Sequence, residues 1–311
     1  MTEEKQKRTE AVKGGRRFAR LMLILVGVLV AAIVCGLMWK TGLLDFRSID
    51  DKLAAIDAEL AIPDAENAAV FYRRFLRNPK NQTTLDDLNS HTPSAYVEPW
   101  DDSEHPELAA ELNTHRMFIQ TLLDISQMHK ARFPVYPDPN SGPFMLSDMR
   151  RLTFILSWAA ANDLAEGRIE AAYSKYRCQL KLVRHLLQQP AAYYRYVGIA
   201  IEAVALGNIR RAVMRDEITP EQLRSVETIL EIPWDQVEKN TEIAAKVDRL
   251  IEEKENSQLP LTIRLKVWWR VLHTRKQDEK KSHQIRLRLL SSRQASRILI
   301  ALRHYKQLRG V

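Results

Sequence analysis

The feature that most constrains this chain is a stretch of nineteen uncharged residues from Leu21 to Trp39. A helix rises about 1.5 Å per residue, so these nineteen would span roughly 28 Å, which is close to the hydrocarbon thickness of a bilayer. Eleven of them are Leu, Ile or Val. A buried core helix would show a polar face, and this segment has none. We therefore predict a transmembrane anchor over residues 17–40.

A cleaved signal peptide is the main alternative to an anchor. The apolar core of a signal peptide is typically about 7–15 residues long and ends in a small-x-small cleavage site. Here the apolar run is longer and is closed by Met38, Trp39 and Lys40. Val34 stands directly before Cys35, where a lipoprotein signal needs a small residue. The sequence thus favours an anchor that is retained.

The charges that flank this segment predict its orientation. Residues 1–20 carry seven basic side chains, whereas residues 40–60 carry three. The more basic side of a transmembrane helix stays in the cytoplasm. We therefore predict an inner-membrane protein with a cytoplasmic N-terminus and with residues 40–311 on the outer face, which is the periplasm in a bacterium. Residues 1–16 are charged and lack apolar periodicity, so we expect a disordered tail.

The remainder of the chain predicts an all-α extracytoplasmic domain built from helical hairpins. Ile49, Leu53, Ile56 and Leu60 form one helical stripe, which places a juxtamembrane helix within 41–62. A helical body follows over 63–260, and basic C-terminal helices over 261–311. Further helices are expected at 147–166, 168–188, 191–215, 220–231, 233–257, 260–282 and 284–309.

Within the body, residues 78–145 hold eight of the thirteen prolines. This composition predicts long loops, interrupted by one helix from about 106 to 130. Gly167 separates two expected helices and is followed by small residues, as in a tetratricopeptide hairpin. The unit does not repeat at 34 residues, so an ordinary antiparallel helix pair is favoured.

Several segments resemble uncharacterised membrane-anchored helical proteins of planctomycete-type bacteria. The residues that carry the resemblance are Ile62-Pro63, Glu66-Asn67-Ala68-Ala69, Tyr72, Ala165-Glu166-Gly167-Arg168, Gly198-Ile199-Ala200-Ile201-Glu202-Ala203, Ile300-Ala301-Leu302-Arg303-His304-Tyr305 and Gly310. The resemblance covers the anchor and most of the helical body. It implies a fold and a compartment, and it implies no activity.

Residues 264–309 form a strongly basic section, with fourteen basic side chains and two acidic ones. Leu261, Leu265, Trp268 and Leu272 make an apolar stripe there, and the groups around it are Arg264, Lys266, Trp269, Arg270, Arg275 and Lys276. Such a helix can lie on an anionic membrane surface. A solvated face whose stripe packs on its own domain is the favoured alternative, and an outer location argues against nucleic acid.

Two further patterns bear on binding. Glu107, Glu111 and His115 are spaced as on one helix face and are weak candidates for a metal site, although exposed helices often carry carboxylates at this spacing. We therefore expect no metal and no other cofactor. Ile298, Leu302, Tyr305 and Leu308 form a second stripe, which needs a partner surface on its own domain or on another subunit.

Two classes of function remain open. The first is a non-enzymatic interaction or scaffold protein tethered to the membrane, with a protein partner or a second copy of itself. The second is a hydrolase or metal-dependent enzyme with its site in segment 78–145, because long loops on a rigid scaffold often carry sites. Clustered carboxylates with strongly shifted pKa values around Trp100–His115 would favour the enzyme.

Overall fold

The structure is a computed structural model that describes residues 47–90, 98–136, 142–214, 218–230, 241–257 and 291–306. The chain divides into two units, Met1–Asp51 and Lys52–Val311. None of the helices in the described ranges is both long and apolar enough to cross a membrane. The predicted tail at 1–16 and the predicted anchor at 17–40 lie outside these ranges.

Residues 47–51 are the described part of the first unit, and they include the start of the first described helix. The Ser48 hydroxyl accepts a hydrogen bond from the Asp51 amide at 3.1 Å, and the Asp51 carboxylate accepts one from the Ser48 amide at 3.3 Å. This reciprocal pair satisfies amides that the first turn leaves without a helical partner. Helix α2 (Ile49–Glu59) follows, and it buries Leu53 and Ile56, two members of the predicted stripe.

The regular secondary structure in the described ranges of the second unit is helical, and the only β-type pairing there is an isolated bridge between Asn67 and Lys130. This confirms the predicted all-α class. The further elements are η1 (Asp64–Glu66), α3 (Ala68–Arg77), α4 (Pro79–Ser90), α5 (Pro106–Thr114), α6 (Arg116–Ser126), α7 (Gly142–Ala165), α8 (Ile169–Leu187), α9 (Ala192–Val213), α10 (Pro220–Leu230), α12 (Thr241–Ser257) and a C-terminal helix at 291–306.

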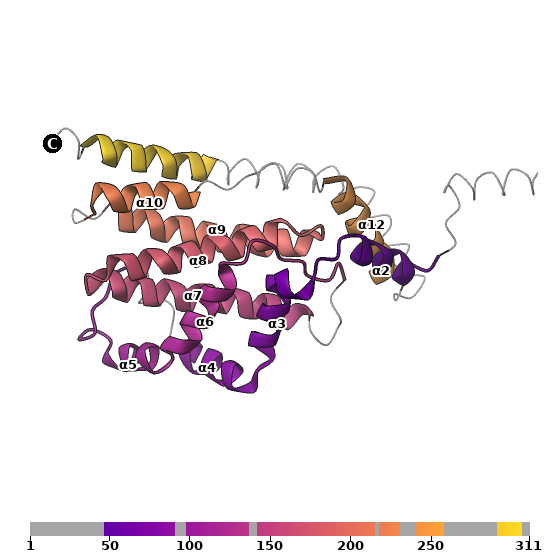
Figure 1. The fold of residues 1–311 in the computed structure, drawn as a ribbon, viewed down its shortest axis with the longest axis horizontal. Coiled ribbons are helices and arrows are strands. Elements are labelled where there is room, and N and C mark those ends of the chain that lie inside the picture. The colour runs from indigo at the N-terminus through magenta and orange to yellow at the C-terminus, as the bar shows by residue number, and fades with distance from the viewer. Residues whose placement is uncertain are drawn as a thin grey trace, which may run out of the picture. The chain divides into compact units, whose positions relative to one another are not determined.

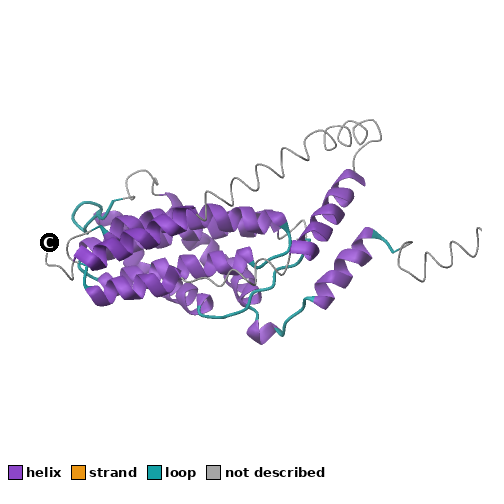
Figure 2. Ribbon diagram, turned by 90° about the horizontal axis from the view of Figure 1, so that it is seen from above, coloured by secondary structure: helices purple, strands orange, loops and turns teal. Residues whose placement is uncertain are grey.

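Helices α7, α8 and α9 form the centre of this unit and pack as consecutive antiparallel neighbours (Figures 1 and 2). The core between them continues to α10 and to Ile300 of the C-terminal helix, which lies beside α10 in Figure 1. Gly198 lets α9 approach α8 closely, because a Cβ there would lie 3.1 Å from the Leu186 Cβ. The helices predicted at 147–166, 168–188, 191–215 and 220–231 agree with α7–α10 within about five residues. The described parts of the helices predicted at 233–257 and 284–309 are Thr241–Ser257 and 291–306, and the helix predicted at 260–282 lies outside the described residues.

The structure differs from the sequence prediction in segment 78–145, where loops were expected and α4 is found. Asn78 ends α3, and its side-chain oxygen accepts a hydrogen bond from the Lys80 amide at 3.0 Å. Pro79 occupies the first turn, where its missing N–H costs nothing. Asn78-Pro79 therefore ends one helix and starts the next, and burial of Leu85 and Leu88 holds α4 on the body.

Asn67 and Ala68 act in packing at the start of α3. Asn67 accepts hydrogen bonds from the amides of Ala69 (3.1 Å) and Arg132 (2.8 Å), and its side-chain amide donates to the Arg132 carbonyl at 3.0 Å. The Ala68 amide donates to the Lys130 carbonyl at 2.9 Å. One buried side chain thus caps α3 and fixes the segment that follows α6.

Candidate functional site

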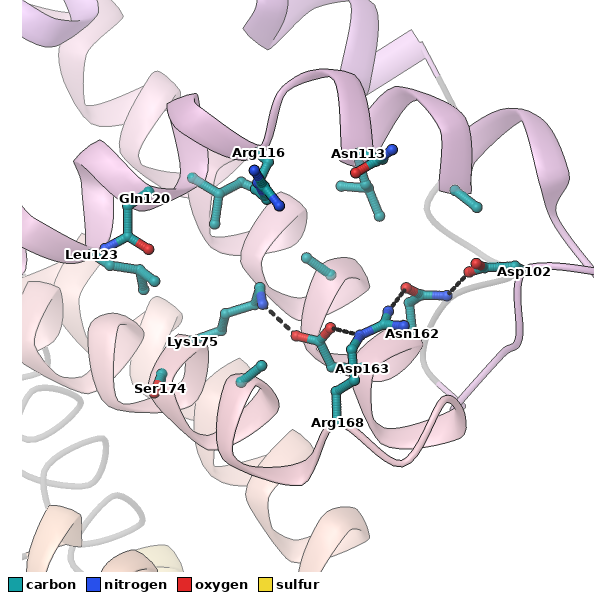
Figure 3. Close-up of a pocket in the computed structure, with 15 residues that line it drawn as sticks. Asp102, Asn113, Arg116, Gln120, Leu123, Asn162, Asp163, Arg168, Ser174 and Lys175 are labelled. Atoms are coloured by element: carbon teal, nitrogen blue, oxygen red, sulfur yellow. Dashed lines mark hydrogen bonds and ion pairs between the residues drawn. The ribbon is translucent and has the colours of Figure 1, made fainter.

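An open cleft of about 540 Å³ lies between the α5–α6 segment and the α7–α8 hairpin (Figure 3). We call it the α5–α8 cleft. Its volume falls in the range of roughly 300–1,000 Å³ that is usual for small-molecule sites. The polar side chains that line it are Asp102, Asn113, Arg116, Gln120, Asn162, Asp163, Arg168, Ser174 and Lys175.

A continuous chain of polar contacts forms one wall of the cleft (Figure 3). The Asp163 carboxylate accepts from Lys175 Nζ on one oxygen and from Arg168 Nε, at 2.8 Å, on the other. Arg168 also donates to Asn162 Oδ1 at 2.6 Å, and Asn162 Nδ2 donates to Asp102 Oδ1 at 2.7 Å. Asp163 and Asn162 are buried, so this wall is fixed before any ligand arrives.

The turn between α7 and α8 positions this wall. Gly167 has a φ of +71°, and no atom lies within 4 Å of the place where its Cβ would be. The Gly167 amide donates to the Leu164 carbonyl at 3.3 Å, and the Arg168 amide donates to the Asp163 carbonyl at 2.7 Å. These two bonds define a Schellman cap, which favours glycine at its left-handed position. The cap directs Arg168 back over the end of α7.

The cleft carries charges of both signs. Asp163 binds two cations at once, and Arg116 lies exposed on the facing wall, at the start of α6. None of the fifteen lining residues is a histidine or a cysteine, the side chains that most often serve as general base or thiol nucleophile. This arrangement can bind a polar or charged group.

The three metal candidates are only partly brought together. His115 Nε2 lies 3.2 Å from a Glu111 carboxylate oxygen, and His115 Nδ1 lies 3.3 Å from the Thr84 hydroxyl. Both ring nitrogens of His115 therefore have protein partners. In the described ranges no group of three His, Cys, Asp or Glu side chains is arranged to hold a metal ion, so Glu107 does not complete a site.

The predicted single helix over 106–130 is two helices in the structure. The break falls at His115, whose φ and ψ of −98° and 21° are not helical and which ends α5 and begins α6. Asn113, Thr114 and His115 all have weak helix propensity, and the sequence pattern did not mark them as a boundary. The break explains why an i, i+4, i+8 spacing does not place three side chains on one continuous face.

The acidic residues just before α5 form a turn. One Asp101 carboxylate oxygen accepts from the amides of Ser103 (2.8 Å) and Glu104 (3.1 Å) and from the Ser103 hydroxyl (2.5 Å). The Ser103 hydrogen bonds lower the pKa of Asp101. A lowered pKa suits a fixed turn and not a general acid, which needs a raised one.

A buried pair that the sequence pattern did not reveal joins α3 to α8. His185 Nε2 lies 2.8 Å from the Met128 carbonyl, and His185 Nδ1 lies 3.2 Å from the Tyr72 hydroxyl. The carbonyl can only accept, so Nε2 carries the proton and Nδ1 accepts from Tyr72. Burial lowers the pKa of His185 to about 4. Both side chains are closed to solvent, so we assign this pair to the core and not to a reaction site.

The remaining candidates divide between the described and undescribed parts of the chain. The predicted basic surface, Arg264, Lys266, Trp268, Trp269, Arg270, Arg275 and Lys276, lies outside the described residues. In the second predicted stripe, Ile298, Leu302 and Tyr305 are exposed on the C-terminal helix, and Leu308 is not described.

In comparisons with known proteins, no protein family, curated protein or solved structure matches this chain.

Proposed function

We propose that this protein is a single-pass, membrane-anchored helical protein that works by interaction and not by catalysis. The observation that carries the proposal is the uncharged stretch Leu21–Trp39, flanked by seven basic residues on one side and three on the other. Residues 1–20 would then face the cytoplasm and residues 40–311 the outer face of the inner membrane. The resemblance to planctomycete membrane proteins implies the same layout.

Two features of the body support an interaction role over the hydrolase alternative. Among the described residues, the carboxyl groups whose pKa is raised are Asp57 and Glu202, which lie outside segment 78–145 and owe the shift first to burial. The α5–α8 cleft presents fixed charges of both signs, which suit recognition of a polar or charged group on a partner. In the described part of segment 78–145, Asp101 and His115 have structural roles, which favours interaction over the enzyme alternative.

The proposed contacts are a membrane, a protein partner or second copy, and an anionic surface. The basic segment around Trp268 and Arg270 supplies the last of these. Each basic group near an anionic surface contributes about 1 kcal/mol, and a membrane tether raises the local concentration of lipid headgroups.

Alkaline extraction of bacterial membranes that contain the full chain tests the anchor. We expect the protein to stay in the pellet, because eleven Leu, Ile and Val residues contribute about −5 kcal/mol to insertion. Two arginines at Leu25 and Val30 would add roughly 5–7 kcal/mol and cancel this term, so Leu25→Arg with Val30→Arg should release the protein.

Leu25→Ala with Val30→Ala is the matched control, and it should stay in the pellet. Release of the unmodified chain by alkali would overturn the anchor. Recovery of a mature chain that begins after Cys35 would show a cleaved signal instead.

A further inference from the structure

One face of the C-terminal helix (residues 291–306) fixes it to the helical body. Arg293, Ser296 and Ile300 are buried on this face. Arg293 forms an ion pair with Glu202 of α9, and Ile300 joins the core that contains α9 and α10 residues. His304 Nε2 also lies 3.0 Å from the Pro220 carbonyl at the start of α10. The body therefore determines which face of this helix points outward.

The opposite face exposes three large apolar side chains, Ile298, Leu302 and Tyr305, which are 58%, 60% and 57% exposed. At about 100° per residue these three fall within a sector of roughly 60°. Ala301, which is also exposed, borders the same sector. We call Ile298, Leu302 and Tyr305 the exposed stripe.

Basic side chains flank the exposed stripe, and acidic ones are missing from this part of the sequence. Arg297 and Lys306 are exposed and lie on opposite sides of the stripe, roughly 70–110° from its centre. From residue 280 to residue 311 the sequence has nine Lys or Arg residues and no Asp or Glu. An apolar centre with an aromatic residue and basic edges is the pattern of a helix that lies in a membrane interface.

We propose that the exposed stripe lies on an anionic lipid surface, with Arg297 and Lys306 at the headgroup level. This inference rests on the proposed anchor: the ten residue-to-residue steps from Trp39 to Ile49 extend at most about 35 Å, so the body stays near the bilayer. A second copy fits the face less well, because pairing two stripes would bring the Arg297 and Lys306 side chains of both copies together. Lipid phosphates neutralise those edges, and acyl chains cover the stripe.

The test uses the full chain in vesicles, with a polarity-sensitive fluorophore on Ala301→Cys in a Cys35→Ser background. Cys178 is buried and burial raises its pKa to about 12, so it stays unlabelled. We expect a blue-shifted emission in vesicles that contain phosphatidylglycerol, reversal by high salt, and no shift in pure phosphatidylcholine. A probe on Ala110→Cys, exposed on α5, should show no shift in either vesicle.

Substitutions in the exposed stripe form the second part of the vesicle experiment. Ile298→Ser with Leu302→Ser should lower the lipid-bound fraction of the C-terminal helix, read from the emission of the probe on Ala301→Cys, by at least about tenfold, because two large apolar contacts are lost. Met117→Ser, at a more exposed position on α6, should leave this fraction unchanged.

Four results would overturn the proposal: no shift in anionic vesicles, an equal shift in neutral ones, a lipid-bound fraction that the stripe substitutions leave unchanged, or a shift that follows protein density and not lipid charge. The last would indicate self-association. Alkaline extraction of the same vesicles reports the anchor separately. A protein that resists extraction without a shift rejects the stripe alone, whereas a shift in an extractable protein supports the stripe and rejects the anchor.

Discussion

Replacing Arg293 by methionine is expected to lower the free energy of unfolding by about 3–5 kcal/mol, which is the usual cost of breaking a buried ion pair from one side. Arg293 on the C-terminal helix donates through Nε to a carboxylate oxygen of Glu202 on α9. Both side chains are buried, and burial raises the pKa of Glu202 while the Arg293 contact lowers it. The variant would leave a buried carboxylate without its cation.

Denaturant unfolding of the full chain, followed by far-ultraviolet circular dichroism, measures this loss. The double variant Glu202→Met with Arg293→Met should regain most of the stability, since neither charge of the buried pair remains. Arg224→Met breaks the exposed Arg224–Glu221 pair and should have little effect. If Arg293→Met unfolds at the same denaturant concentration as the unmodified protein, the pair does not hold the C-terminal helix.

Acidification from pH 6.5 to pH 4 is expected to cost about 3 kcal/mol of stability through His185 alone. Its pKa is about 4 in the folded chain, first because of burial, against about 6.5 when unfolded. Between these values the unfolded chain binds more protons, so the His185 contribution is complete above pH 6.5 and is lost as the pH falls toward 4. Each pKa unit corresponds to about 1.4 kcal/mol.

Comparing the pH dependence of the free energy of unfolding between variants separates the contribution of His185 from that of carboxylates that titrate in the same range. His185→Gln removes the titration, so the stability of this variant should fall less steeply with acid. His129→Gln changes an exposed histidine and should keep the steep fall. Equal pH dependence in all three proteins would show that His185 is not held neutral in the core.

Helix class and position in the second half of the chain followed from apolar periodicity, because α7, α8 and α9 are long and bury regular faces. The sequence pattern did not predict helix boundaries at residues that end one helix and also begin the next. Asn78-Pro79 ends α3 and also starts α4, and composition alone suggested only a loop. His115 breaks a pattern that would otherwise continue from α5 into α6.

The α5–α8 cleft was beyond the reach of spacing arguments. Its wall joins Arg168 to Asp163, which meet because a Schellman cap at Gly167 turns the chain, and Asn162 to Asp102, which lies 60 positions earlier. The Tyr72–His185 contact spans 113 positions. Such pairs depend on how helices pack, and a single sequence does not record that. By contrast, the periodicity of Ile298, Leu302 and Tyr305 was visible in the sequence, and all three are exposed; the partner surface of this stripe stays a prediction.

The orientation of the chain across the membrane is the central claim, and reporter fusions after Val311 test it most directly. An enzyme that is active only in the periplasm, fused there in a bacterial host, should be active, and one that is active only in the cytoplasm should be silent. Reversing the flanking charge asymmetry should exchange the two signals. A cytoplasmic reporter that is active after Val311 in the unmodified chain would contradict the account.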